Sequence, residues 1–157
     1  MVVLRRGRPL RILALASAGG HWVQLQRITP AFAGWDIAFA CTDPHYGDDI
    51  PGQRYYTISD ANRFTRHRLP LAALQICWII RRERPDLIIS TGAAPGLIAL
   101  LLGKLVFRRR TIWIDSMANA DRLSTSGRLA GRLADLWLTQ WPHLAEADGP
   151  QFWGPVL

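Results

Sequence analysis

A short segment near the N-terminus joins two glycines to a histidine and could hold an anion or move a proton. The segment is Ser17-Ala18-Gly19-Gly20-His21, between an apolar run and a helix-forming stretch. Glycines in such a turn let a ligand approach the backbone, and the first N–H groups of the next helix favour an anion. His21, at the helix start, is a candidate proton acceptor. The alternative is a tight turn that needs glycine for its geometry alone, with His21 merely beside the cap.

A second segment, Thr91-Gly92-Ala93-Ala94-Pro95-Gly96, repeats this pattern after another apolar run. A helix start with proline in its first turn explains Pro95 but not the small residues before it. Two such turns on one edge of a sheet predict a polar cleft lined by backbone. Neither segment is a GxGxxG motif or a P-loop, which argues against ordinary dinucleotide binding.

Two carboxylates also follow apolar runs. Asp43, in Thr42-Asp43, is a candidate general base or sugar-hydroxyl acceptor, and its alternative role is to open a turn before Pro44. Asp115, followed by Ser116, opens a polar loop. It either contacts a ligand or is a buried, hydrogen-bonded group.

The elements that must position these loops alternate between strands and helices. We expect strands over 12–16, 36–41, 54–58, 86–90, 111–115 and 136–140, and helices over 21–29, 70–82, 95–107 and 126–134, the last capped by Ser126. Several strands are continuous apolar runs, as in parallel sheets covered on both faces. The alternation predicts a doubly wound, mostly parallel, Rossmann-like α/β sheet, whose ligands bind at the carboxyl ends of the strands. We expect one Rossmann-like domain over 11–157 behind a basic N-terminal extension, 1–10.

Composition and charge narrow the classes of partner. The 157 residues are 49% hydrophobic, which excludes a disordered chain. The net charge is +7, and Lys104 is the one basic residue besides arginine. Arginine suits phosphates and anionic headgroups. No nucleic-acid motif accompanies the charge, so we expect no nucleic-acid partner. Two cysteines without a Cys/His cluster predict no metal site.

Two apolar stretches end in arginines. Residues 71–80 precede Arg81 and Arg82, and residues 97–107 precede Arg108, Arg109 and Arg110. Such a surface can dock on anionic lipid. The alternatives are that the arginines complement helix dipoles and that the apolar faces are buried in the sheet or against a partner chain. The most apolar stretch, 95–107, would cover about 20 Å of a hydrocarbon core of about 30 Å, so we expect no spanning segment.

Taken together, these segments resemble a known family. The sequence is similar to the acceptor-side half of two-subunit GT-B glycosyltransferases, namely the eukaryotic asparagine-linked glycosylation "fourteen" subunit and its bacterial capsule and exopolysaccharide relatives of the PssD/CpsF type. The resemblance runs from about residue 10 to 157 and is carried by residues 16–21, 42–43, 84–92, 115–116, 123–129, 134–135, 140–142 and 152–154. The family more usually has Glu at the position of Asp115 and Arg at that of Asn119.

The resemblance implies one half of an enzyme that holds a lipid-diphosphate-linked acceptor while a donor-binding glycosyltransferase subunit supplies the nucleotide sugar. It implies an inverting transfer without a metal or other cofactor, little turnover without the partner, and a cytoplasmic location on the inner face of the cell membrane. The anionic surface of this membrane would contact Arg81, Arg82, Arg108, Arg109 and Arg110. The alternative is a non-catalytic anchor that recruits the catalytic subunit.

On this basis each motif receives a hypothetical role. His21 or Asp43 is the base, and Gln140-Trp141-Pro142 is a partner-binding or structural motif. The residues assigned to the acceptor and its diphosphate are Ser17, Gly19, Gly20, Thr91, Gly92, Asp115 and Ser116.

Overall fold

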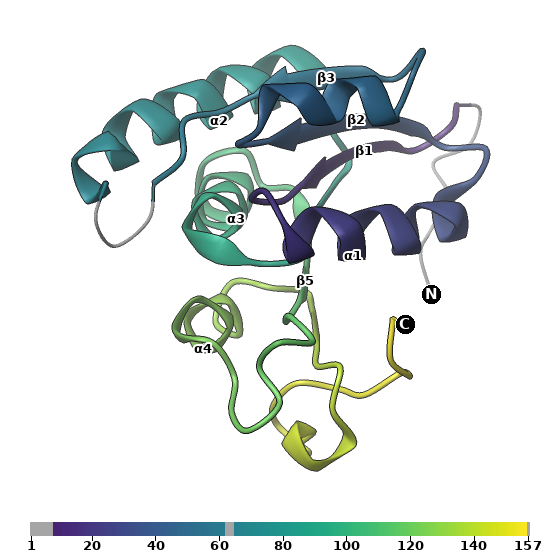
Figure 1. The fold of residues 1–157 in the computed structure, drawn as a ribbon, viewed down its shortest axis with the longest axis vertical. Helices are drawn as coiled ribbons and strands as arrows, with labels where there is room; N and C mark the ends of the chain where they lie inside the picture. Colours follow the sequence, from purple (N-terminus) through teal and green to yellow (C-terminus); the bar gives the residue numbers. More distant parts are fainter. Residues whose placement is uncertain (1–7, 62–64, 157) are drawn as a thin grey trace.

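The structure is a computed structural model that describes residues 8–61 and 65–156. Most of the basic extension expected over 1–10 lies outside the described residues, and the boundary at residue 11 stays a prediction. The chain forms a six-stranded sheet in the order β3-β2-β1-β4-β5-β6, in which every neighbouring pair is parallel (Figure 1). The strands are β1 (Arg11–Leu15), β2 (Asp36–Cys41), β3 (Arg54–Thr57), β4 (Leu87–Ser90), β5 (Arg110–Ile114) and β6 (Leu136–Leu138). The predicted doubly wound, parallel fold is confirmed.

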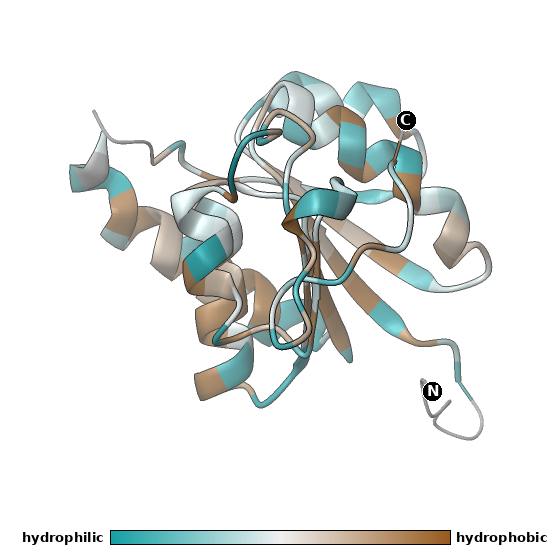
Figure 2. Ribbon diagram, turned by 90° about the horizontal axis from the view of Figure 1, so that it is seen from below, coloured by the Kyte–Doolittle hydropathy of each residue, from teal (hydrophilic) through white to brown (hydrophobic). Residues whose placement is uncertain are grey.

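Helices cover both faces of this sheet. They are α1 (Gly20–Ile28), α2 (Leu69–Glu83), α3 (Ala93–Leu101) and α4 (Thr125–Ala130), and α3 continues into a π-helical turn, η4 (Leu102–Val106). Short 3-10 turns occur at η1 (Thr29–Phe32), η2 (Pro44–Asp49), η3 (Arg66–Arg68) and η5 (Pro142–Leu144). One core contains Leu13 and Ile88 with residues of α2, α3 and α4, and the other contains Ile12 and Ile89 with residues of α1. Successive strand residues therefore enter opposite cores, which explains the continuous apolar strands. Hydrophobic stretches, brown in Figure 2, run along strands in the middle of the molecule.

The strand order reverses between β1 and β4. From β1 the chain proceeds outward to β2 and β3, and α2 then returns it to β4 on the other side of β1. At such a switch point the loops after the two neighbouring strands diverge to opposite faces and leave room for a ligand. The register pairs Leu15 with Ser90, so the loops that follow β1 and β4 begin at the same level.

Three elements depart from their predicted bounds by two residues or more, and the last helix ends at Ala130 rather than at residue 134. The last helix begins at Thr125 rather than after Ser126, because Ser124 is its cap and accepts a hydrogen bond from the Gly127 amide at 2.8 Å. The helix expected over 95–107 begins two residues earlier and ends as a π turn. The strand expected over 136–140 ends at Leu138, beyond which the chain pairs with residue 151.

Candidate functional site

The candidate site lies at the carboxyl edge of the sheet, where the β1 and β4 loops meet. α1 begins at Gly20 and α3 begins at Ala93, each directly after a strand and a short loop. The first N–H groups of both helices therefore face the same edge. This arrangement brings together the two glycine-containing segments singled out in the sequence, although 70 residues separate them.

His21 is joined to Thr91 by a reciprocal pair of hydrogen bonds. Its Nδ1 lies 2.9 Å from the Thr91 carbonyl oxygen, and the Thr91 hydroxyl donates to the His21 carbonyl at 2.7 Å. A carbonyl oxygen only accepts, so Nδ1 carries the proton and the neutral ring keeps its lone pair on Nε2. Nε2 has no hydrogen-bond partner among the described residues. His21 thus has the tautomer that a general base at Nε2 requires.

Gly92 provides the space for the His21 ring. Its backbone has φ 143° and ψ −173°, a conformation that is essentially restricted to glycine. A Cβ atom built at this position would lie 2.5 Å from His21 Nδ1 and would also collide with Cε1. The glycine is therefore required both by its backbone conformation and by the histidine packed against it.

The first glycine-containing loop has two amides that the chain itself satisfies. The Ala18 amide donates to the Thr42 hydroxyl at 2.9 Å, and the Gly19 amide donates to the Tyr46 hydroxyl at 3.2 Å. The amides of Gly20 and His21, in the first turn of α1, have no partner among the described residues. Gly19 supplies the turn at φ 78°, and the open amides of this loop are those of Gly20 and His21. The anion-binding role of Gly19 and Gly20 stays a prediction. Ser17 precedes this turn and is half-buried.

Asp43, the other candidate base, caps a turn. Its carboxylate accepts a hydrogen bond from the His45 amide at 3.0 Å, and its carbonyl accepts one from the Tyr55 hydroxyl. These contacts correspond to the turn-opening role weighed from the sequence. The β2 loop that carries Asp43 lies beside the β1 loop, because the two strands pair directly.

Asp115 is the centre of a buried hydrogen-bond network and is 2% exposed. One carboxylate oxygen accepts from Trp113 Nε1 and the Ser124 hydroxyl, and the other accepts from the Ser124 amide and Asn119 Nδ2, at 2.7–3.2 Å. Both oxygens are therefore occupied by the chain. Asp115 thus holds the loop between β5 and α4, which is the buried, hydrogen-bonded role considered from the sequence, and its contact with the acceptor stays a prediction.

Ser116 and the Gln140-Trp141-Pro142 motif also tie segments together. The Ser116 hydroxyl accepts from Gln24 of α1 at 3.3 Å, which links the β5 loop to the face of α1. Gln140 accepts from the Val156 amide at 2.7 Å, and Trp141 donates to the Met117 carbonyl at 3.0 Å. The motif thus has a structural role that joins the C-terminal segment to the β5 loop.

Two aromatic residues of the site were missed in the sequence. Tyr46 stacks on Trp22 with ring centroids 5.3 Å apart and planes 6° apart, and its hydroxyl reaches the Gly19 amide. Trp22 in turn donates to the Asp49 carboxylate at 3.3 Å. No local signal marks Tyr46, because its partners are 24 and 27 residues away along the chain.

Two titratable groups near this edge, Cys41 and Tyr55, have raised pKa values. Burial raises the pKa of the Cys41 thiol, which opposes a thiolate nucleophile. Burial and the neighbouring Cys41 and Asp43 raise the pKa of Tyr55. In the described part of the chain, no three His, Cys, Asp or Glu side chains are grouped to hold a metal ion.

The arginines at the ends of α2 and η4 lie at the opposite, amino edge of the sheet. Arg81, Arg82, Arg108 and Arg110 are exposed, whereas Arg109 is half-buried and its Nε atom has no partner within residues 8–61 and 65–156. Arg109 is therefore the least suited of the five to contact a surface. No helix of the described residues is long and apolar enough to cross a membrane.

Comparison with known proteins assigns the family. The family described as "Oligosaccharide biosynthesis protein Alg14 like" matches residues 53–156, well over half of the sequence. The chain belongs to the Alg14-like family. It is 28% identical to the UDP-N-acetylglucosamine transferase subunit ALG14 of Eremothecium gossypii over 90% of this chain and 77% of that protein. The human subunit of the same name is also 28% identical, over 87% of this chain and 78% of its own length.

Solved structures extend this likeness to the fold. The Alg14-like chain superposes on MurG from Acinetobacter baumannii with a TM-score of 0.76 at 12% identity, over 92% of this chain and 45% of MurG. A UDP-N-acetylglucosamine 2-epimerase from Rickettsia bellii gives a TM-score of 0.65 at 14% identity, over 87% of this chain and 40% of the epimerase. At these identities the likeness concerns the fold alone. The chain spans less than half the length of either enzyme.

Proposed function

We propose that this Alg14-like chain is the acceptor-binding subunit of a heteromeric, inverting glycosyltransferase. The acceptor is a lipid-diphosphate-linked sugar, and the donor is a nucleotide sugar held by a second subunit. The observation that carries the proposal is the His21 imidazole at the switch point. Its Nδ1 proton is held by the Thr91 carbonyl, while Nε2 has no partner within residues 8–61 and 65–156. The relatives named as UDP-N-acetylglucosamine transferase subunits support the reaction class.

In the proposed reaction, the acceptor hydroxyl attacks the anomeric carbon of the donor sugar. The new bond forms from the face opposite the nucleotide, whose diphosphate leaves with the electrons of the broken C–O bond. Nε2 of His21 takes the proton of the attacking hydroxyl. The Gly20 and His21 amides hold the diphosphate of the acceptor, because two N–H groups at a helix N-terminus provide both hydrogen bonds and a favourable dipole.

A separate donor-binding subunit completes this site. In this proposal the switch-point edge forms the acceptor wall of the cleft, and the second subunit forms the donor wall. The subunit names of the relatives also point to an assembly. We expect turnover only when both subunits are present. Full activity of this chain alone with a nucleotide sugar would refute the proposal.

Attachment to the inner face of the cell membrane would bring the chain to its acceptor. The outer face of α2 exposes Leu71, Leu74 and Trp78 and ends in Arg81 and Arg82. The apolar side chains would enter the headgroup boundary, and each arginine near an anionic surface adds about 1 kcal/mol. We expect vesicles containing phosphatidylglycerol to carry the chain in flotation, and salt to reverse this. Absence of the chain from the floated fraction would count against membrane attachment.

Two substitutions of His21 test the catalytic role in the reconstituted pair. His21→Ala removes the ring, whereas His21→Asn keeps an N–H that can donate to the Thr91 carbonyl but has no basic nitrogen in the place of Nε2. Loss of a general base lowers kcat by about 10²–10⁴-fold, so we expect both variants to fall in this range. The exposed His45→Ala is the matched control and should keep its rate.

The same pair of variants separates the enzyme subunit from the non-catalytic anchor. An anchor would tolerate both substitutions as long as the complex forms, which co-purification of the two subunits measures. If His21→Asn turns over at the parental rate, His21 only positions the loop and is not the base. If both variants do so, the anchor replaces our proposal.

A further inference from the structure

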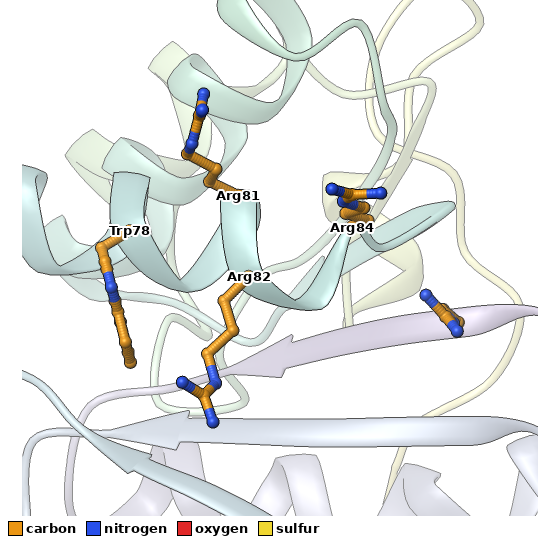
Figure 3. Close-up of a pocket in the computed structure, with 5 residues that line it drawn as sticks. Trp78, Arg81, Arg82 and Arg84 are labelled. Atoms are coloured by element: carbon orange, nitrogen blue, oxygen red, sulfur yellow. The ribbon is translucent and has the colours of Figure 1, made fainter.

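A groove lined by arginines lies at the end of α2, remote from the candidate catalytic edge. It has a volume of about 470 Å³ and is lined by Arg11 of β1 and by Trp78, Arg81, Arg82 and Arg84. Figure 3 shows Trp78 and Arg82 extending from one side of α2 toward the strands, with Arg84 beyond the last turn. Arg81 points the other way in this view and forms the outer rim.

The groove carries positive charge that the carboxylates of the described residues do not fully neutralise. Asp36 and Glu83 both pair with Arg54, at 2.6 Å and 3.0 Å. Asp86 pairs with Arg8 at 2.9 Å and accepts a hydrogen bond from the Arg11 amide at 3.2 Å. Asp36 also lies 3.5 Å from Arg11. No carboxylate of residues 8–61 and 65–156 lies within 4 Å of Arg81, Arg82 or Arg84. The C-terminus of α2 carries roughly half a negative charge, which is less than the positive charge of these three arginines. These guanidinium groups are therefore available to an anion.

An apolar pocket adjoins this groove and shares one wall with it. Its volume is about 370 Å³, and its lining includes Tyr56, Leu74, Trp78 and Ile79. Trp78 lines both cavities, packs edge-on against Tyr56 at 5.8 Å, and has the Arg82 guanidinium 5.2 Å from its ring centroid. Leu74 and Trp78 are nevertheless 69% and 53% exposed. A cationic half and an apolar half thus meet at a single tryptophan.

We propose that this two-part groove binds one anionic phospholipid, with its phosphate among Arg11, Arg82 and Arg84 and its acyl chain along Leu74 and Trp78. A free phosphate would use only the cationic half and leave the apolar half in water. Arginine forks match phosphate oxygens, and tryptophan is suited to the boundary between headgroup and chain. The inference rests on the proposed membrane attachment and makes it a stoichiometric, headgroup-selective contact rather than a diffuse attraction.

A titration with soluble lipid tests the groove without any membrane. The probes are dihexanoyl phosphatidylglycerol below its micelle concentration, dihexanoyl phosphatidylcholine and inorganic phosphate, each followed by calorimetry. We expect phosphatidylglycerol to bind with 1:1 stoichiometry and at least about tenfold more tightly than the other two. Inorganic phosphate lacks an acyl chain for the apolar half, and the trimethylammonium group of phosphatidylcholine is repelled by the arginines.

Paired variants locate the binding. The double variant Arg82→Gln/Arg84→Asn should weaken phosphatidylglycerol at least about tenfold, since each arginine makes a charge-assisted contact. Asn is chosen because Arg84 has φ 48°, which Asn tolerates. The exposed pair Arg128→Gln/Arg132→Gln removes the same charge from elsewhere and should change binding less than about threefold. If the first variant does not fold by circular dichroism, Arg82→Gln alone takes its place.

A further variant, Leu74→Ser, identifies the occupant. It should weaken phosphatidylglycerol and leave inorganic phosphate unchanged. Equal affinities for these two probes would make the groove a free-anion site and overturn the lipid assignment. Equal losses in both arginine variants, or equal binding of phosphatidylcholine, would overturn the groove itself. If the chain still floats with vesicles but does not bind the soluble lipid, the groove assignment is wrong and the proposed membrane attachment stands. Transferase turnover of the reconstituted pair tests the proposed function separately.

Discussion

Gly92→Ala is the substitution that probes the candidate site most directly. The added methyl group would overlap the His21 ring, with its carbon 2.5 Å from Nδ1, whereas nonbonded heavy atoms are most stable about 3.5–4.0 Å apart. The ring must therefore move by roughly 1 Å, and its hydrogen bond to the Thr91 carbonyl must lengthen or break. The new residue must also adopt φ 143° and ψ −173°.

These effects set the expected magnitudes. A non-glycine residue in this backbone region costs about 1–3 kcal/mol, and loss of the Thr91 hydrogen bond adds about 1 kcal/mol. We therefore expect the free energy of unfolding to fall by about 2–4 kcal/mol. A 1 Å misplacement of a catalytic group lowers the rate about 10²-fold, so kcat should fall by about this factor even where the variant is fully folded.

Urea unfolding of the chain and turnover of the reconstituted pair measure the two effects. The control is Gly34→Ala, which also has a positive φ, at 84°, but has no atom within 4 Å of the added methyl. It should lose about 1–2 kcal/mol of stability and no activity. If Gly92 acts through His21, Gly92→Ala should cost little further turnover in a His21→Ala background.

Two results would refute this reasoning. A Gly92→Ala variant with turnover within about threefold of the parent would show that the position of the His21 ring does not matter to the reaction. Additive losses in the double variant would show that Gly92 acts on turnover by a route other than His21.

The other predictions concern carboxylates that hold the loops. Asp115→Asn replaces one buried carboxylate oxygen with an amide NH₂ group that faces two hydrogen-bond donors. Each lost hydrogen bond costs roughly 1.5 kcal/mol or more, so we expect the free energy of unfolding in urea to fall by about 3 kcal/mol. The exposed Asp121→Asn should change it by less than about 0.5 kcal/mol, and a similar loss in both variants would contradict the network. Burial raises the pKa of Asp135, but hydrogen bonds from Lys104 and Thr111 outweigh it, so the net pKa is lowered. Its contribution is full above about pH 4 and disappears as the pH falls through the folded-state pKa. The Tm difference between the parent and Asp135→Asn should therefore shrink below about pH 4, and a constant difference down to about pH 2.5 would refute the assignment.

The architecture and the meeting of the two glycine segments could be predicted from the sequence. Continuous apolar strands alternating with helices indicate a parallel, doubly wound sheet, and in that topology the β1 and β4 loops share an edge. The contact between His21 and Thr91 could not be predicted from the pattern. The imidazole proton of His21 is held on Nδ1 by a carbonyl 70 residues away, and no local spacing of residues indicates this.

Other features depended on tertiary contacts that the sequence does not encode locally. Ser124 and Ser126 are equivalent as caps by residue type, and Ser124 takes the role because the Asp115 carboxylate binds both its amide and its hydroxyl. The same contacts decide between the two roles weighed for Asp115. The hydroxyls of Thr42 and Tyr46 reach the first loop from another strand end, so the number of open amides could not be counted from the loop itself.

The imidazole proton of His21 is held by a main-chain oxygen, and this affects how the protein can vary in evolution. A side-chain acceptor is lost with its residue, whereas a peptide oxygen survives any replacement that preserves the path of the backbone. Substitution of Thr91 can therefore remove its hydroxyl while the main-chain carbonyl still holds the proton on Nδ1 of His21. Position 92 is more constrained and must remain glycine, because any side chain there would collide with the imidazole.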